Sequence, residues 1–234
     1  MSIQNGVNPR HMKQSLDVIY ANRFVANESE RTRVWLTLTR HYFQRWVQNT
    51  YTVIDVGAGY CEFINNIQAA RKYAIDLNPV VQLKAAPDVT VCNQDIAQPW
   101  TLGTDFADIV FSSNFFEHLP SKDDLQRCLQ EAHRVLRPGG RLIAMGPNIR
   151  FCSDVYWDFF DHYLPLSDRS LAEALQLVGF QVEQVIPRFL PYTMKDTHPP
   201  HASLIRLYLA LPIFWKIMGK QFLVVARKRA SATQ

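Results

Sequence analysis

The residues of this sequence that are best suited to chemistry are acids and glycines that follow short runs of β-branched residues. Asp55, Gly57 and Gly59 lie in VIDVGAGYCEF, Asp76 ends KYAID and Asp95 ends VTVCNQD. Glycine permits a tight turn and removes the Cβ atom that would keep a ligand away from the backbone. Carboxylates at strand ends can accept hydrogen bonds from ribose hydroxyl groups and from an adenine amino group. This pattern predicts a binding site for a nucleoside.

Glu62, near the start of the next helix, helps to decide which kind of nucleoside cofactor fits this turn. A dinucleotide-binding turn, G-x-G-x-x-G/A, would have glycine or alanine at that position. A glutamate there would also repel a pyrophosphate docked at the start of the next helix. A ligand with a positive centre and no phosphate suits this acidic turn better, and S-adenosylmethionine has adenine, ribose, a sulfonium cation and an amino-acid end. Asp55 can then reach the ammonium group through a water or orient the turn.

Candidates for the transfer chemistry lie further along the chain. Asn114 ends FADIVFSSN, where we expect it to contact the cofactor. His118 follows, and its imidazole titrates near neutrality and can act as a base, with a structural or cofactor-side role as the alternative. Asp161 and His162 are the preferred acid/base candidates. They lie in the segment 147–167, whose aromatic residues, acids and histidine suit a sugar or polyhydroxylated ring unless the segment is only a lid packed on the sheet.

The sequence predicts no metal site. A metal-dependent mechanism of the catechol type would need an acid after the fourth strand, where Ser112, Ser113 and Asn114 stand instead. Arg23 and Arg188 are further polar anchors, because arginine can hold a carboxylate or phosphate through two parallel hydrogen bonds.

The elements that must position these residues alternate between strand and helix, which predicts an α/β fold with a doubly wound, Rossmann-like parallel sheet covered on both faces. Proline-free helical spacing covers residues 16–47. Further helices are expected at 60–70, 121–136 and 168–178, the second stopped by Arg137-Pro138-Gly139-Gly140. Strands are expected in YTVIDVG, KYAIDLNP, VTVCNQD, FADIVFSSN, RLIAMGPN, FQVEQVIPRFL and KQFLVVARK.

This organisation predicts an N-terminal helical cap at 1–49 and one domain at 50–234. The domain carries insertions on the substrate side at 147–167 and 190–219. Within the second insertion, residues 202–218 are unusually apolar. They form either a helix packed on the domain or a surface for a lipid-linked acceptor or an interfacial membrane contact.

The amino-acid composition argues against several functional classes, among them nucleic-acid-binding and membrane-spanning proteins. The chain has 234 residues, a net charge of +4 and 47% hydrophobic residues, enough for a substantial core. No basic block indicates nucleic acid, and no apolar run reaches the length of a transmembrane helix. The four cysteines lack metal-ligand spacing and no apolar leader opens the chain, so we expect reduced thiols in a cytoplasmic protein.

Taken in order, the motifs resemble those of class I S-adenosylmethionine-dependent methyltransferases. VIDVGAGYC resembles the first motif, D-x-G-x-G-x-G, with Cys61 in place of the last glycine. AIDLNP resembles the ribose-binding strand end, with Asp76 and Leu77, and NQDIAQ resembles the adenine-contacting acid and its apolar neighbour, Asp95 and Ile96. DIVFSSNFFEHLP and EAHRVLRPGGRLIAMGPN resemble the fourth strand, the next helix and the L-x-P-G-G turn of the small-molecule branch, which includes unassigned bacterial methyltransferases.

The resemblance covers roughly residues 50–185. It implies a seven-stranded mixed sheet of order 3-2-1-4-5-7-6 with the seventh strand antiparallel, and S-adenosylmethionine as cofactor. It also implies methyl transfer to a small molecule, such as a hydroxyl of a sugar or glycan precursor. The alternatives are a nucleotide-dependent reductase and a cofactor-binding regulatory module that has lost catalysis.

Overall fold

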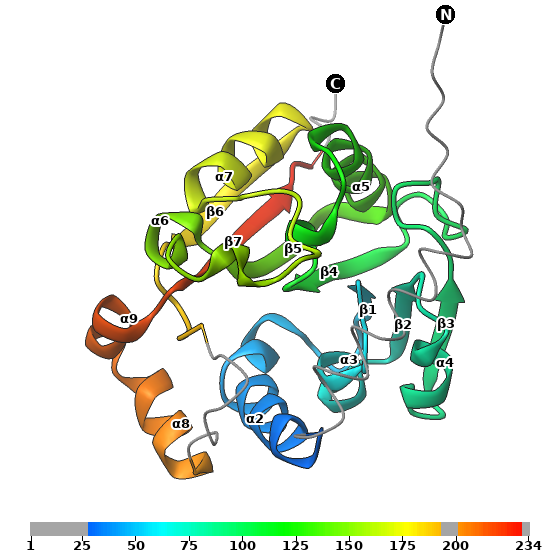
Figure 1. Cartoon of the computed structure of the whole chain (residues 1–234). Coiled ribbons are helices and arrows are strands. Elements are labelled where there is room, and N and C mark those ends of the chain that lie inside the picture. Colours follow the sequence, from blue (N-terminus) through cyan, green and yellow to red (C-terminus); the bar gives the residue numbers. More distant parts are fainter. Residues whose placement is uncertain (1–27, 193–200, 231–234) are drawn as a thin grey trace, which may run out of the picture.

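A seven-stranded sheet of order β3-β2-β1-β4-β5-β7-β6 runs through the molecule, in a computed structural model that describes residues 28–192 and 201–230 (Figure 1). β7 is antiparallel to both β5 and β6. The strand order and the antiparallel seventh strand that the resemblance implied are therefore confirmed. The strands are β1 Thr52–Val56, β2 Arg71–Asp76, β3 Val89–Asn93, β4 Ala107–Ser113, β5 Leu136–Pro147, β6 Phe180–Ile186 and β7 Gln221–Lys228.

Helices cover both faces of the sheet, as the β-branched strands require. α5 (Lys122–Val135) and α7 (Asp168–Leu177) lie on one face, and α2 (Glu28–His41), α3 (Glu62–Asn66) and α8 (Ala202–Ala210) lie on the other (Figure 1). The shorter helices are η1 Phe43–Trp46, α4 Val80–Lys84, η2 Phe116–His118, α6 Ile149–Cys152, η3 Tyr156–Asp158 and α9 Pro212–Met218.

The central strand β1 is buried along its whole length, and its alternation divides the core in two. Ile54 and Val56 pack with α5 and α7, whereas Val53 packs with α2, α3 and α8. Because successive side chains of a strand point to opposite faces, one apolar run contributes to both cores.

Several predicted boundaries shift. The helix expected at 60–70 is shorter, Glu62–Asn66, and the helical pattern at 16–47 is described only from Glu28 onward. The turn Arg137–Gly140 does not separate α5 from a strand, because β5 already begins at Leu136. Its pairing with β4 continues past this point through a bulge between Ala107 and Ile109. Ser121 caps α5, as predicted, by accepting from the backbone N–H of Asp124.

The carboxyl ends of β1, β2 and β4 meet at one edge of the sheet. Val56 is in register with Ile75 of β2 and with Ser112 of β4. β1 lies between β2 and β4, where the strand order reverses, and ligands of doubly wound sheets bind outside this point. None of the helices described in this model is long and apolar enough to cross a membrane.

Candidate active site

The glycine turn after β1 adopts a left-handed backbone at three positions. Gly57 has φ 70°, Gly59 has φ 51° and Cys61, in the place of the family's third glycine, has φ 62°. A Cβ atom on Gly57 would lie 2.2 Å from the ring of Phe115. The close approach to the backbone that the sequence predicted is therefore made by the ring of Phe115.

Asp76 ends β2 directly beside this turn. Its carboxylate accepts from the backbone N–H of Gly59 at 2.7 Å and from that of Asn78 at 2.8 Å. Burial raises the pKa of Asp76, against the effect of these hydrogen bonds, which lower it. A carboxylate has about four acceptor positions. Asp76 therefore holds the turn in place and keeps capacity for the ribose hydroxyls predicted for it.

Asp55 lies beneath the turn and is 4% exposed. Burial raises its pKa well above the ordinary value, and the nearby carboxylates of Glu62 and Asp76 add to the effect. The backbone of Ile64 in α3 has the opposite, smaller effect on this pKa. This interaction fits the orienting role foreseen for Asp55, since it ties the turn to the helix that follows.

Glu62, the residue that disfavoured a pyrophosphate, forms an ion pair with Arg31 of α2. The guanidinium of Arg31 also lies 4.8 Å from the ring centre of Tyr60 within the turn. Arg31 was not predicted from the sequence, because it lies 31 positions before Glu62 and no local pattern indicates this contact.

The remaining residues predicted to bind the cofactor, Asp95 and Ile96 at the adenine end and Leu77 at the ribose end, differ in exposure. The side chain of Asp95 is exposed and accepts from the backbone N–H of Ala97 at 2.9 Å. Leu77 is 45% exposed, whereas Ile96 is only 3% exposed and packs in the core with α5. Asp95 and Leu77 are thus accessible to a ligand, whereas Ile96 is part of the core beneath them.

Asn114 follows β4 with a left-handed backbone, φ 49°. Its backbone N–H donates to the carbonyl of Met145 at 2.8 Å, and its side-chain amide donates to the Ser113 hydroxyl at 3.0 Å. The exposed side chain therefore lies at the edge where β1 and β4 end, as predicted.

His118 and Asp161 are 43 positions apart and in direct contact. Nδ1 of His118 lies 2.9 Å from the backbone oxygen of Asp161 and 3.2 Å from its carboxylate. Both partners are acceptors, so Nδ1 carries the proton and Nε2 is the basic nitrogen of the neutral ring. Burial lowers the pKa of His118, but the hydrogen bond that the ring donates to Asp161 and the charges of Glu117 and Asp161 outweigh this, and the pKa is raised.

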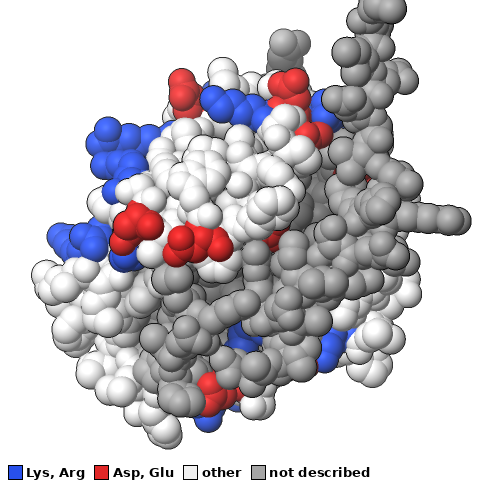
Figure 2. Space-filling view, viewed as in Figure 1, with Lys and Arg blue, Asp and Glu red and all other residues white. Residues whose placement is uncertain are grey.

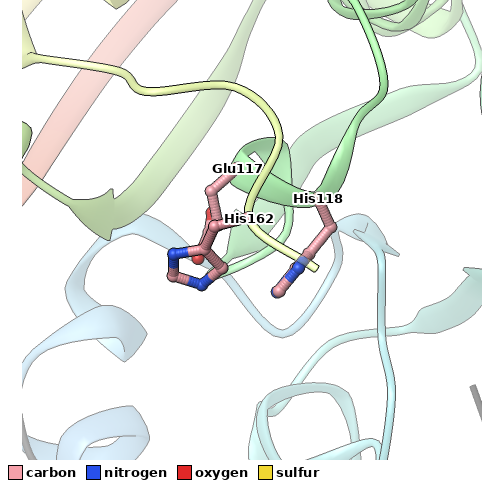
Figure 3. Close-up of side chains that lie close together, drawn as sticks. All are labelled: Glu117, His118 and His162. Carbon is pink, nitrogen blue, oxygen red and sulfur yellow. The ribbon is translucent and has the colours of Figure 1, made fainter. Parts of the chain in front are cut away.

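His162 completes the group of predicted acid/base residues. Its ring lies 5.0 Å from that of His118, centre to centre, and stacks at 4.9 Å on Phe159. Figure 3 shows the two histidines converging with Glu117, which precedes His118 in η2. The structure thus brings together all three candidates from two distant segments, and adds Glu117, which the sequence analysis did not single out.

Glu117, His118 and His162 also form a set that can hold a metal ion. One ligand atom from each lies within 4.8 Å of the others. Two ligands of a zinc ion at about 2.1 Å are at most about 4.2 Å apart, so every pair of these three atoms must lie within that distance when an ion is bound. The sequence predicted no metal, and it had no means of seeing this convergence.

The segment 147–167 is anchored to the same place. The backbone N–H groups of Tyr163 and Leu164 donate to the carbonyl of Glu117 at 2.9 and 3.1 Å. The buried hydroxyl of Tyr156 donates to the carbonyl of Leu164 at 2.7 Å. We name this segment the lid; its loop is held at the residue that precedes His118.

The turn and its neighbours fit an adenosyl cofactor. Asn78, beside Asp76, buries a side-chain nitrogen that donates to no partner within the described ranges. A cofactor hydroxyl at Asp76 would give that donor an acceptor. Of the two predicted arginine anchors, Arg23 lies outside the described residues. Arg188 instead donates to the carbonyls of Gly219 and Ile217 at the end of α9.

Comparison with known proteins also indicates a methyltransferase. Residues 54–144 match the model of a methyltransferase domain. A 106-residue stretch is 34% identical to malonyl-[acyl-carrier protein] O-methyltransferase 1 of Coxiella burnetii, covering 43% of this chain and 36% of the relative. The match therefore spans about a third of that relative's length.

Solved structures share the fold over most of the chain. An S-adenosylmethionine-dependent methyltransferase from Archaeoglobus fulgidus aligns with a TM-score of 0.64 and 18% identity, over 86% of this chain and 97% of its own. The same TM-score and identity are found, over 87% and 93%, for a structure from a complex with the Trm112 methyltransferase activator of Haloferax volcanii. Residues 54–144 therefore carry a methyltransferase domain, and these similarities indicate a class I S-adenosylmethionine-dependent methyltransferase with S-adenosylmethionine as its cofactor.

Proposed function

We propose that this protein methylates a hydroxyl group of a small molecule, such as a sugar or glycan precursor, with His118 as the base. The observation that carries the proposal is the contact of His118 Nδ1 with Asp161, at 2.9 Å to the backbone and 3.2 Å to the carboxylate. It leaves Nε2 unprotonated, and no described residue engages this nitrogen.

The residues of the turn hold the cofactor in this proposal. Asp76 and Leu77 bind the ribose end, Asp95 and Ile96 the adenine end, and Asp55, Gly57, Gly59 and Asn114 shape the methionine end. When bound, S-adenosylmethionine supplies an electrophilic methyl group on its sulfonium. His118 takes the proton of the acceptor hydroxyl at Nε2, and Asp161 orients the ring and stabilises the imidazolium. His162 positions His118 through the contact between their rings.

The lid holds the acceptor. It leaves β5 at the edge where β1 and β4 end, and three of its aromatic residues, Trp157, Phe160 and Tyr163, are 59%, 89% and 54% exposed. Exposed aromatic faces beside acids suit a sugar ring. We also propose that residues 1–49 act as a helical cap on the domain 50–234, supported by the ion pair of Arg31 with Glu62 at the turn. The four free cysteines are consistent with a cytoplasmic location.

A carboxylate acceptor is the second candidate. The Coxiella burnetii relative is by name an O-methyltransferase of malonyl-acyl carrier protein. A carboxylate is already deprotonated near neutrality and needs no base. The two candidates therefore differ in how strongly turnover depends on His118.

The test compares His118→Ala and Asp161→Asn with His133→Ala, a partly buried histidine of α5 outside the site. Acceptor fractions are screened with S-adenosylmethionine, and the product is identified by mass spectrometry. For a hydroxyl acceptor we expect His118→Ala to lower kcat by about 10² to 10⁴, Asp161→Asn to lower it less, and cofactor affinity to stay unchanged. A carboxylate product with less than a threefold loss in His118→Ala would favour the second candidate and exclude His118 as the base.

Metal independence is tested in the same assay. We expect full activity after dialysis against EDTA, because the proposed role of His118 needs Nε2 free. Complete loss that zinc or magnesium restores in the wild type, but not in Glu117→Gln, would instead identify the set of Glu117, His118 and His162 as a metal site.

A further inference from the structure

The helices α8 and α9 expose an unusual amount of apolar surface. Six large side chains there are between 41% and 65% exposed: Leu204, Leu207, Leu211, Ile213, Ile217 and Met218. We call these six residues the apolar patch. Single exposed leucines are common on protein surfaces, but a contiguous set of this kind marks an interaction site.

The patch follows from the geometry of the two helices. Ile205 and Leu209 of α8 are buried in the core, and Leu204, Leu207 and Leu211 recur at spacings of three and four on the opposite side. No residue of α9 is buried, so this helix lies on the surface. Trp215 is held between them, since its indole N–H donates to the carbonyl of Tyr208 at 2.8 Å.

All charges of this region are positive. Residues 201–220 contain Arg206, Lys216 and Lys220 and no Asp or Glu. Figure 2 shows Lys and Arg gathered at the left edge of the molecule, with Asp or Glu side chains beside them, above an uncharged surface over α9 and α8. The apolar patch therefore has a cationic border.

A groove of about 520 Å³ runs along this border, between α9 and the start of α7. Arg150, Arg169, Arg188 and Lys216 line it, together with Trp215 and Asp168. Asp168 is paired with Arg150 at 2.8 Å, and Asp154, an exposed acid of the lid, lies 3.5 Å from Lys220. Arg169 and Lys216 have no ion-pair partner within the described ranges, so the groove keeps an excess of positive charge.

We propose that α8 and α9 bind the surface of a bilayer that contains anionic lipids. The apolar patch enters the boundary of head groups and acyl chains, and the cations of the groove contact the phosphates. A symmetric dimer through the same face would place these cations against their own copies, which opposes self-association. The inference does not depend on methyl transfer, and it places the lid, which Lys220 joins to α9 through Asp154, next to the membrane.

The experiment is co-sedimentation of the full chain with vesicles of phosphatidylcholine alone or with 30% phosphatidylglycerol. We expect binding to the anionic vesicles, at least tenfold weaker binding to the neutral ones, and a further loss as salt is raised. Leu207→Glu/Ile217→Glu should lower the partition coefficient at least tenfold, and Lys216→Gln about fivefold. Leu83→Glu is the matched control, because Leu83 is an 83% exposed leucine on α4, and it should bind like wild type.

Circular dichroism verifies the fold of each variant, and light scattering measures its mass. Equal binding of wild type and Leu207→Glu/Ile217→Glu, or no binding to either kind of vesicle, overturns the proposal. A wild-type dimer that this double variant converts to a monomer, without vesicle binding, assigns the apolar patch to self-association instead. Inorganic phosphate at 10 mM should not prevent the protein from binding the anionic vesicles. If phosphate releases the protein from these vesicles, the groove is a free-phosphate site instead.

Discussion

Glu117 is a carboxyl group in the midst of the proposed acid/base residues, 4% exposed, and burial raises its pKa to about 7. The positive charge of a protonated His118 opposes this increase in the pKa, and the negative charge of Asp161 adds to it. Two titrating groups therefore stand side by side in the sequence, where the proton of one affects that of the other.

The raised pKa of Glu117 makes stability depend on pH. Below the unfolded pKa of 4.5 the group is protonated in both states, and between 4.5 and about 7 the native state binds more protons, so stability falls as pH rises. We expect Glu117→Gln to gain about 2–3 kcal/mol relative to wild type between pH 5 and pH 8. Urea unfolding at the two pH values measures this, and a constant difference between the proteins would contradict the pKa.

His118 gives a second dependence, on turnover. Because Asp161 stabilises the imidazolium, the limb of kcat that rises with pH should lie above pH 6.5, and Asp161→Asn should move it to lower pH. A purely structural histidine would leave the position of this limb unchanged. The pH profile of kcat in the variant and in wild type decides between the two.

These residue-level contacts mark the limit of what the sequence predicted. Asp76 and the glycines could be assigned because short β-branched runs place them at strand ends. The contact of His118 with Asp161 joins residues 43 positions apart, and neither segment carries a local pattern that names its partner. The role of Glu117 depends on burial by the lid, which composition alone does not reveal.

At the scale of elements, the turn between β1 and α3 is constrained from two sides. Gly57 needs a left-handed backbone and also makes room for Phe115 of the segment after β4. Its role is thus partly structural, because it lets two strand ends pack closely.

Substitution of Gly57 should therefore be costly. We expect Gly57→Ala to lower the free energy of unfolding by about 2–4 kcal/mol, from the left-handed φ and from the overlap with Phe115. Gly103→Ala is the control, since nothing lies within 4 Å of its added Cβ. Gly57→Ala/Phe115→Ala should relieve the overlap but keep the backbone strain. Denaturation of wild type and the three variants separates these two contributions to the loss of stability. Equal stability of Gly57→Ala and Gly103→Ala would refute the prediction.

The strands were the elements that could be predicted best. Their apolar runs are continuous because both faces of the sheet are covered. Asp, Asn and Gly residues at the ends of these runs indicated where the strands stop. Helices were predicted less well where tertiary contacts decide their ends. α3 ends at Asn66 instead of residue 70, and β5 begins at Leu136, the last residue of the helix expected at 121–136.

At the scale of the whole molecule, cofactor binding should be visible as stability. Saturating S-adenosylmethionine at about 100 times Kd contributes about 2.7 kcal/mol, which raises the Tm of a chain of this size by about 5–10 °C. Asp76→Asn should weaken binding about tenfold to a hundredfold and reduce the shift, whereas Asp123→Asn on α5 should not. NADH should produce no shift; a larger response to NADH than to S-adenosylmethionine would contradict the cofactor assignment.

The hydrogen bonds between the lid and Glu117 connect the binding of the acceptor to the binding of the cofactor. The lid is attached to the carbonyl of Glu117, and the same short segment carries Phe115 against the glycine turn. An acceptor that favours one arrangement of the lid thereby acts on the segment that borders the cofactor. Equilibrium linkage is reciprocal, so any factor by which the acceptor tightens cofactor binding is the factor by which the cofactor tightens acceptor binding. The two ligands would then load cooperatively, and the empty protein would hold neither as firmly as the ternary complex holds both.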